Sequence, residues 1–421
     1  FMENIMEEQL EEVPRFLNAD YIDVIVKKIE KTNKVKVQKF ELKPVTKKGN
    51  HYASVMIRIV VDYVVVESKN HKQLSLILKT TYDEKHDEEE TIKLLKEFDV
   101  HNREMEIYEK VLDEFHKLLR TINDETIFSA HKYWIDKTNR ALILEDLMAR
   151  KYKCVNRIER MDVAHAKLAL TKLAKYHATS IIFKQKNPQA YAKFNKGYFS
   201  REHKQDSREF CFKQFDGLIE LVSNWEGYEY YAEKLIKFKD LLVERGIELY
   251  TPQESGFNVL LHGDFWSNNM MFRYDSENNP VDVIFVDFQI PQWITPAIDI
   301  IYFIHSSMKE HLRFTKQNEL VQMYYYALKE TLIDGYKYTG YFPTLHEFQI
   351  IILKSSLHAL ISALLIQPII ILDEKIESNL FLLMNKDEAG KKFTHDMYHS
   401  PNTQEAVKNV LPVFDALGIL D

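Results

Sequence analysis

The sequence has little cysteine and lacks the marks of a secreted protein. Its 421 residues include two cysteines, Cys154 and Cys211, which excludes a disulfide framework. No Asn-x-Ser/Thr acceptor site for glycosylation occurs. The segment from Met2 to Glu8 is acidic and has no basic-then-apolar signal pattern. We therefore expect a reducing, cytoplasmic compartment.

An excess of positive charge and long apolar runs are also absent. Lys plus Arg is 56 against 63 for Asp plus Glu, a formal charge of −7, which argues against a nucleic-acid-binding surface. The longest apolar run, 359–372, is too short to span a bilayer and contains Gln367-Pro368, so no membrane partner is expected. The sixteen histidines show no zinc-ligand spacing. These features indicate an ordinary globular protein, long enough for two lobes.

The pattern of apolar residues changes near residue 145. Before it, the periodicity predicts a helix at 15–31, strands at 35–42, 52–67 and 73–80, a helix at 89–115 and a strand at 142–144. After it, long helices dominate. Asp162 can cap the first of them, 184–206 is expected to be a loop or insertion, 207–248 is helical and aromatic-rich, and helices continue from 299 to 417. We predict an N-terminal lobe at 1–145 and a C-terminal lobe at 146–421.

The most informative motif is His262-Gly263-Asp264-Phe265-Trp266-Ser267-Asn268-Asn269, followed by Val286-Asp287-Phe288-Gln289. Its His-x-Asp-x-x-x-x-Asn spacing is that of a kinase catalytic loop, and Asp287 stands where kinases carry Asp-Phe-Gly. Phosphoryl transfer needs a carboxylate to receive the acceptor's proton and oxygen ligands to hold Mg²⁺. We assign the first role to Asp264 and the metal to Asn269 and Asp287.

A hairpin is expected between the two parts of the motif. Residues 270–275 and 281–288 are predicted strands, with the turn at 276–280. If Asn278 is the centre, Asn269 and Asp287 are directly opposed, and the Cβ atoms of opposed residues lie about 4.5–5.5 Å apart. His262 is expected to hold the loop rather than act as a base or metal ligand. Asp299 is expected to cap the following helix or to brace the loop.

Lys79 and Glu104 are the candidate phosphate-binding pair. Lys79 ends the strand at 73–80, where a kinase lysine contacts the α- and β-phosphates and a helix glutamate. Glu104 lies on a largely apolar helix face, where a carboxylate needs a partner. Asn50, in the turn at 49–54, is a candidate phosphate-facing residue, although a simple hairpin turn fits as well. Glu145 and Leu147 are placed where backbone groups would meet adenine.

Together these segments resemble the insect ecdysteroid-kinase-like proteins, relatives of choline kinases and aminoglycoside phosphotransferases. The resemblance covers about residue 45 to the C-terminus and rests on 262–272 and 281–289, with 52–56, 76–80, 144–147 and 173–178 also similar. It implies an α+β, two-lobed protein-kinase-like fold with a small β-rich N-lobe and a large helical C-lobe. It also implies ATP- and Mg²⁺-dependent phosphorylation of a hydroxyl group. The functional positions of the family then correspond to Lys79, Glu104, Asp264, Asn269 and Asp287.

The identity of the acceptor stays open at this level. We expect a monomeric small-molecule kinase whose alcohol substrate is lipophilic, an ecdysteroid or a dietary toxin. Aromatic residues of 207–248 and apolar groups of 355–372 would line an uncharged acceptor pocket. A choline or ethanolamine kinase is the alternative, with Tyr228, Tyr230 and Tyr231 available for a cation site. A non-catalytic pseudokinase is a further alternative. A protein kinase is disfavoured because no Ala-Pro-Glu segment follows Asp287.

Overall fold

The computed structural model describes residues 13–45, 54–81, 97–195, 197, 199–373, 382–383 and 385–421. The chain forms two compact units. Unit 1 comprises Phe1–Lys110, Ser129–Lys153 and Glu377–Phe381, and unit 2 comprises Val111–Phe128, Cys154–Ile376 and Leu382–Asp421. The expected lobe boundary at residue 145 stays a prediction.

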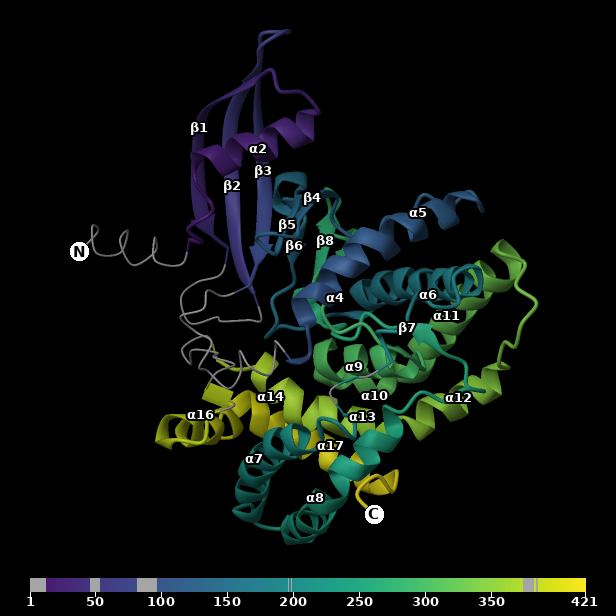
Figure 1. Cartoon of the computed structure of the whole chain (residues 1–421). Coiled ribbons are helices and arrows are strands. Elements are labelled where there is room, and N and C mark those ends of the chain that lie inside the picture. Colours follow the sequence, from purple (N-terminus) through teal and green to yellow (C-terminus); the bar gives the residue numbers. More distant parts are fainter. Residues whose placement is uncertain are drawn as a thin grey trace. The chain divides into compact units, whose positions relative to one another are not determined.

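Unit 1 is built on a five-stranded antiparallel sheet with the order β1-β2-β3-β5-β4 (Figure 1). Alternate residues of a strand point to opposite faces, and in β2 the apolar set Ile57, Ile59, Val61 and Tyr63 is buried. Helix α2 packs its buried side chains, Ile22, Ile25 and Val26, into the same core. The elements of unit 1 are α2 (Ala19–Glu30), β1 (Val35–Pro44), β2 (Val55–Val65), β3 (Asn70–Thr80), α4 (Val100–Glu106), β4 (Lys132–Asp136), β5 (Ala141–Glu145) and the 3-10 helix η3 (Leu147–Arg150).

The strands of unit 1 lie where the sequence predicts them, with one addition. Strand β4 was not predicted, because its residues are mostly half-buried and show no clear alternation. The predicted helix at 89–115 is divided: α4 ends at Glu106, the π-helical turn η2 (Ile107–Val111) follows, and α5 (Leu112–Arg120) belongs to unit 2. The part of that helix from 89 to 96 lies outside the described residues, as do Asn50 and most of its turn.

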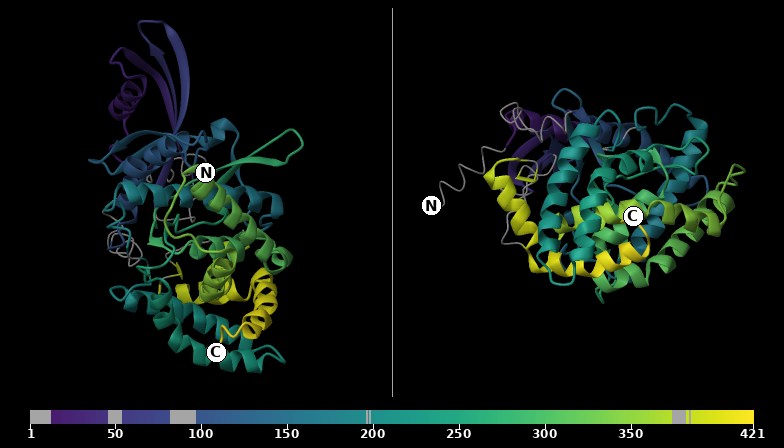
Figure 2. Two further views of the ribbon diagram at one scale, coloured as in Figure 1. Left: turned by 90° about the vertical axis from the view of Figure 1, so that its right-hand side faces the viewer. Right: turned by 90° about the horizontal axis from the view of Figure 1, so that it is seen from below.

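Unit 2 is mainly helical (Figures 1 and 2). Its long helix α6 (Val163–Lys186) begins as predicted at Asp162, whose side chain accepts a hydrogen bond from the His165 N–H at 3.1 Å. The thirteen buried residues of α6 include most of its second half, so this helix is a core element. Helix α7 begins at residue 204 and α6 ends at residue 186, which leaves the predicted loop region between them.

The remaining helices of unit 2 follow α6 in the chain, and a short strand pair and a hairpin lie between α8 and α9 in the sequence. They are α7 (Lys204–Ser223), α8 (Glu229–Leu249), α9 (Ala297–Ser307), α10 (Glu310–Thr315), α11 (Gln317–Lys329), η5 (Glu330–Gly335), α12 (Leu345–Lys354), α13 (Ser356–Ile361), η6 (Ser362–Ile366), α14 (Gln367–Ile370), α16 (Glu388–Tyr398) and α17 (Pro401–Ala416). The strands are β7 (Val259–Leu260) with β10 (Trp293–Ile294), and the hairpin β8 (Met270–Tyr274) with β9 (Pro280–Phe285); β6 (Lys153–Cys154) lies at the unit boundary. The α+β fold expected from the sequence is confirmed.

No single helix within the described ranges is long and apolar enough to cross a membrane. The segments Leu345–Lys354 and Ser356–Ile370 pass that test only as a pair bent by 50°. Most side chains from Leu360 to Leu365 are buried in unit 2. Their apolar character is therefore explained by the protein core.

Candidate active site

The loop at 262–269 is held by the carboxylate of Asp299. This side chain, in the first turn of α9, accepts hydrogen bonds from the backbone N–H groups of His262 at 2.7 Å and Gly263 at 2.9 Å. A third bond comes from His177 of α6, whose Nε2 lies 3.2 Å from Oδ2, and Tyr324 of α11 bonds the other ring nitrogen at 2.6 Å. Burial lowers the pKa of His177, so the ring is neutral. Asp299 therefore braces the loop, one of its two expected roles, and Pro296 occupies the helix cap.

Gly263 occupies a position that other residues cannot adopt without strain. Its φ is +85°, and a Cβ atom there would lie 1.7 Å from the backbone oxygen of Ile290. The loop thus passes directly against the segment that follows Asp287. This close approach requires the absence of a side chain.

His262 has the structural role predicted for it. The side chain is buried, its Nε2 donates to the backbone oxygen of Val286 at 3.0 Å, and its ring lies 4.6 Å from that of Phe288. Burial lowers the pKa of His262. A neutral imidazole bonded to a carbonyl fixes the loop against the β9 end and takes no proton there.

Asp264 is surrounded by hydrogen-bond donors. Oδ1 accepts from the Tyr302 hydroxyl at 2.9 Å, and Oδ2 accepts from Asn269 Nδ2 at 2.7 Å and from Trp266 Nε1 at 3.2 Å. Desolvation and the charge of Asp287 raise the pKa of Asp264 to about 6, against the lowering effect of these three bonds. A carboxylate held in this way can orient a hydroxyl group and accept its proton.

Asn269 has its amide orientation fixed by two bonds. Nδ2 donates to the backbone oxygen of Asp264 at 2.9 Å as well as to its carboxylate. Because the nitrogen is used twice, Oδ1 is the atom that Asn269 can offer to a cation. With Asp287 nearby, the oxygen donors fit the preference of Mg²⁺ for carboxylate and carbonyl ligands.

The predicted register of the hairpin is wrong by one residue. Met270 pairs with Phe285 and Arg273 with Asp282, and a bulge then shifts Tyr274 to Pro280. The residue opposite Asn269 is Val286, whose N–H donates to the backbone oxygen of Asn269 at 3.0 Å. Asp287 follows the ladder with a φ of +69°, so its side chain is directed by a turn and not by strand alternation. The charge of Asp287 contributes to the raised pKa of Asp264, after desolvation by burial.

Two contacts of Asp264 were not predicted, those from Tyr302 and Trp266. Tyr302 lies one helical turn after Asp299 on α9, so the two share a face and both reach the loop. That spacing is the signal that could have identified Tyr302. Trp266 is part of the motif itself, but its spacing alone does not show that the indole turns back to the carboxylate.

In unit 1, Lys79 and Glu104 form the predicted ion pair. Lys79 Nζ of β3 lies 2.7 Å from Glu104 Oε2 of α4, and the side chains are 5% and 1% exposed. Buried charges persist only when they are paired in this way. Their role toward phosphates stays a prediction.

The other predicted nucleotide-binding positions lie at the end of β5. The Glu145 N–H donates to the His131 oxygen at 2.9 Å, and its carboxylate bonds Arg150 at 3.1 Å. Leu147 is buried in η3, which Asp146 caps by accepting from the Met148 N–H. Asp146 also accepts from Arg58 and Ser75. Contact of Glu145 and Leu147 with a nucleotide stays a prediction.

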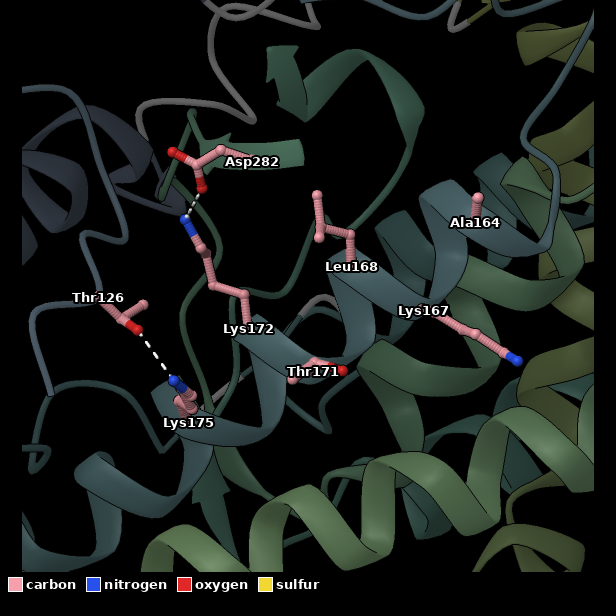
Figure 3. Close-up of a pocket in the computed structure, with 8 residues that line it drawn as sticks. All are labelled: Thr126, Ala164, Lys167, Leu168, Thr171, Lys172, Lys175 and Asp282. Atoms are coloured by element: carbon pink, nitrogen blue, oxygen red, sulfur yellow. Dashed lines mark hydrogen bonds and ion pairs between the residues drawn. The ribbon is translucent and has the colours of Figure 1, made fainter. Parts of the chain in front are cut away.

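A depression of about 290 Å³ lies along α6 (Figure 3). It is lined by Thr126, Ala164, Lys167, Leu168, Thr171, Lys172, Lys175 and Asp282. Each of its lysines is ion-paired, Lys167 to Glu319, Lys172 to Asp282 and Lys175 to Asp124. No predicted site residue lines it, and its paired charges do not form an anion site.

Comparison with known proteins identifies the family. The family model described as "Ecdysteroid kinase-like family" matches residues 48–335, more than half of the chain. The chain belongs to this family. It is a family of small-molecule phosphotransferases, and membership implies the use of ATP. The matched range contains every predicted site residue.

Other comparisons add little. A search of the curated proteins finds no match. Among solved structures, the chain is similar to a Plasmodium vivax ethanolamine kinase, with 12% sequence identity and a TM-score of 0.40 over 90% of this chain and 84% of that one. We base no argument about the substrate on a similarity of this size.

Proposed function

We propose that this small-molecule kinase uses Mg²⁺-ATP to phosphorylate a hydroxyl group of a neutral, lipophilic compound, an ecdysteroid or a dietary toxin. The observation that carries the proposal is the Asp264 carboxylate, fixed by Tyr302 and Asn269 beside Asp287. Asp264 orients the acceptor hydroxyl and takes its proton. Asn269 and Asp287 hold the metal, which neutralises charge on the phosphates. Lys79, paired with Glu104, contacts the nucleotide phosphates.

The choline alternative is weakened by the surroundings of the aromatic cluster at the start of α8. Lys408 lies 4.6 Å above the Trp225 ring, and Lys234 lies 5.2 Å from the Tyr230 ring, whose hydroxyl bonds Asp415 at 3.4 Å. Lysine side chains of the protein therefore already occupy the positions over these two rings that a choline ammonium group would take. Phe212 is similar, with Arg208 and Lys239 each 4.6 Å from its ring.

These contacts bear on one part of the expected acceptor pocket. Phe215 and Leu218 are core residues, as expected for much of 207–248. Phe212, Trp225 and Tyr230 contact charged side chains, which makes them weaker candidates for an uncharged pocket. A cytoplasmic location, a monomeric state and a role in detoxification stay proposals.

ADP release with a panel of alcohols tests the proposed function. The panel contains neutral steroids, plant phenolics and uncharged alkaloids, together with choline, ethanolamine and an aminoglycoside. We expect release with neutral compounds and none with the cationic ones. Release only with quaternary or polycationic alcohols would overturn the substrate class. The absence of release with every compound, while Mg²⁺-ATP still binds, would favour the pseudokinase.

A further inference from the structure

The hydrogen bonds of Asp264 define the side from which an acceptor can approach. A carboxylate has about four lone-pair sites, two on each oxygen. Oδ2 accepts from both Asn269 and Trp266, so its sites are used. Oδ1 accepts from Tyr302, which leaves one site on this oxygen. A hydroxyl group that gives its proton to Asp264 is therefore directed to Oδ1, next to the Tyr302 phenol.

Tyr302 belongs to a row of rings that leads away from Asp264. The ring of His358, on α13, lies 5.8 Å from that of Tyr302. His358 Nδ1 shares a hydrogen bond of 2.8 Å with the Tyr250 hydroxyl, at the end of α8. The Tyr250 ring in turn stacks on Phe199 at 5.2 Å. We call Tyr302, His358 and Tyr250 the acceptor row.

His358 has a polar atom that the described residues leave without a partner. The side chain is 5% exposed, and its Nε2 is buried with no hydrogen-bond partner among them. Because Nδ1 is engaged by Tyr250, Nε2 is the atom that His358 can offer to another molecule. Buried polar groups in folded proteins are almost always hydrogen-bonded, so a bound molecule could supply the missing partner of this atom.

We propose that His358 Nε2 hydrogen-bonds the acceptor molecule, and that the acceptor row forms the acceptor-binding side of the Asp264 site. This inference rests on the proposed function and names a recognition residue for it. The hydroxyl to be phosphorylated lies at Oδ1 of Asp264, beside Tyr302. A second polar group of the same molecule bonds His358. The acceptor thus carries at least two hydrogen-bonding groups, as a polyhydroxylated steroid does.

The row suits a neutral compound. Burial raises the pKa values of Tyr250 and Tyr302, so both stay phenols. Burial lowers the pKa of His358 to about 4, so the imidazole is uncharged near neutral pH.

Three variants test the proposal. His358→Phe removes both ring nitrogens, whereas His358→Gln keeps a side chain that can form hydrogen bonds. The matched control is His305→Phe on α9, because His305 is equally buried, bonds Gln317 through Nε2 and also has an unpartnered Nδ1. Its ring contacts are with Phe314 and Phe414, outside the acceptor row. Melting temperatures of all variants identify any that fail to fold, in which case His358→Gln carries the test.

The measurement is the dissociation constant of ecdysone by calorimetry, with Mg²⁺ and a non-hydrolysable ATP analogue present. If ecdysone does not bind, the neutral panel compound with the largest ADP release is the probe. We expect His358→Phe to weaken binding about tenfold, the size of one lost hydrogen bond. His358→Gln should recover part of this loss, and His305→Phe should change little. In turnover, the acceptor KM should rise while kcat and the ATP KM change little.

Equal effects of His358→Phe and His305→Phe would overturn the proposal, because they would show a general role in packing. Binding of choline but of no neutral compound would overturn it as well, as would a wild-type protein that binds no probe. Failure of the proposed function looks different: a neutral probe binds and depends on His358, but no ADP is released.

Discussion

Among single residues, Asp264 has the most direct chemical role. We expect Asp264→Asn to keep Mg²⁺-ATP binding and to lose turnover by about 10²–10⁴-fold, because an amide cannot accept the hydroxyl proton. The loop should remain in place, because Asp299 holds it through the backbone N–H groups of His262 and Gly263. Steady-state ADP release and calorimetry with ATP measure the two effects. Near-normal turnover would exclude Asp264 as the base.

Asp287 should act on the metal. We expect Asp287→Ala to abolish Mg²⁺-dependent nucleotide binding, because Asn269 alone offers one neutral oxygen. Glu277→Ala is the control, since Glu277 is an exposed carboxylate in the turn of the same hairpin. Calorimetric titration with ATP, with and without Mg²⁺, gives the comparison. Unchanged affinity in Asp287→Ala would place the metal elsewhere.

The residues of the site were predictable to different degrees. Lys79 and Glu104 could be paired from the sequence because each lies on an apolar element. A charged side chain is rarely buried there unless an oppositely charged partner is close. The relation of Asn269 to Asp287 was predicted with the wrong register, because a bulge and a positive φ are set by local sterics that alternation does not encode. Tyr302 and His358 come from helices distant in the chain, and only the packing of unit 2 brings them together.

At the scale of elements, the catalytic loop depends on Gly263. We expect Gly263→Ala to destabilise the protein by more than the strain of a left-handed residue, which is about 1–3 kcal/mol, because its Cβ would overlap the Ile290 oxygen. Gly227→Ala is the matched control: φ there is +82°, but nothing lies within 4 Å of the added Cβ. Chemical denaturation measures both. Equal losses would mean that the loop moves freely away from Ile290.

The pair between β3 and α4 should act as one unit. Lys79→Ala should weaken ATP binding and slow transfer, and Glu104→Ala should do so less, with non-additive effects in the double variant. Lys72 and Glu30 provide a control, because they also join β3 to a helix of unit 1, at 2.9 Å, but are more exposed. A double-mutant cycle on the ATP dissociation constant gives the coupling. Strictly additive losses would show that the pairing has no part in binding.

Most elements could be predicted because their periodicity is strong. The alternation of β2 and the Asp162 cap of α6 are examples. The helix predicted from 89 to 115 is divided in the structure, because apolar spacing continues through η2 while the backbone there changes its hydrogen-bond pattern. Its last part, α5, runs on to Arg120. Strand β4 was missed because it is a short strand at the sheet edge, where burial on one face is incomplete.

For the whole molecule, nucleotide binding should raise the free energy of unfolding. A ligand that binds the folded state stabilises it by about 2.7 kcal/mol at a concentration of 100 times its Kd. We therefore expect ATP to raise the melting temperature in the presence of Mg²⁺ and EDTA to remove both this increase and ADP release. Thermal denaturation with a series of ATP concentrations measures it. An increase of the same size in EDTA would show that nucleotide binding does not need the metal.

The repulsion between Asp264 and Asp287 affects whether ATP binds as its Mg²⁺ complex or without the metal. Burial and then the charge of Asp287 raise the pKa of Asp264, so a second negative charge is unfavourable for this buried carboxylate. Metal-free ATP would bring further negative charge to the same place, whereas a divalent cation compensates both carboxylates and phosphates. We therefore expect the protein to bind the metal complex in preference to the free nucleotide, so that ATP in excess over Mg²⁺ competes weakly in the ADP-release assay.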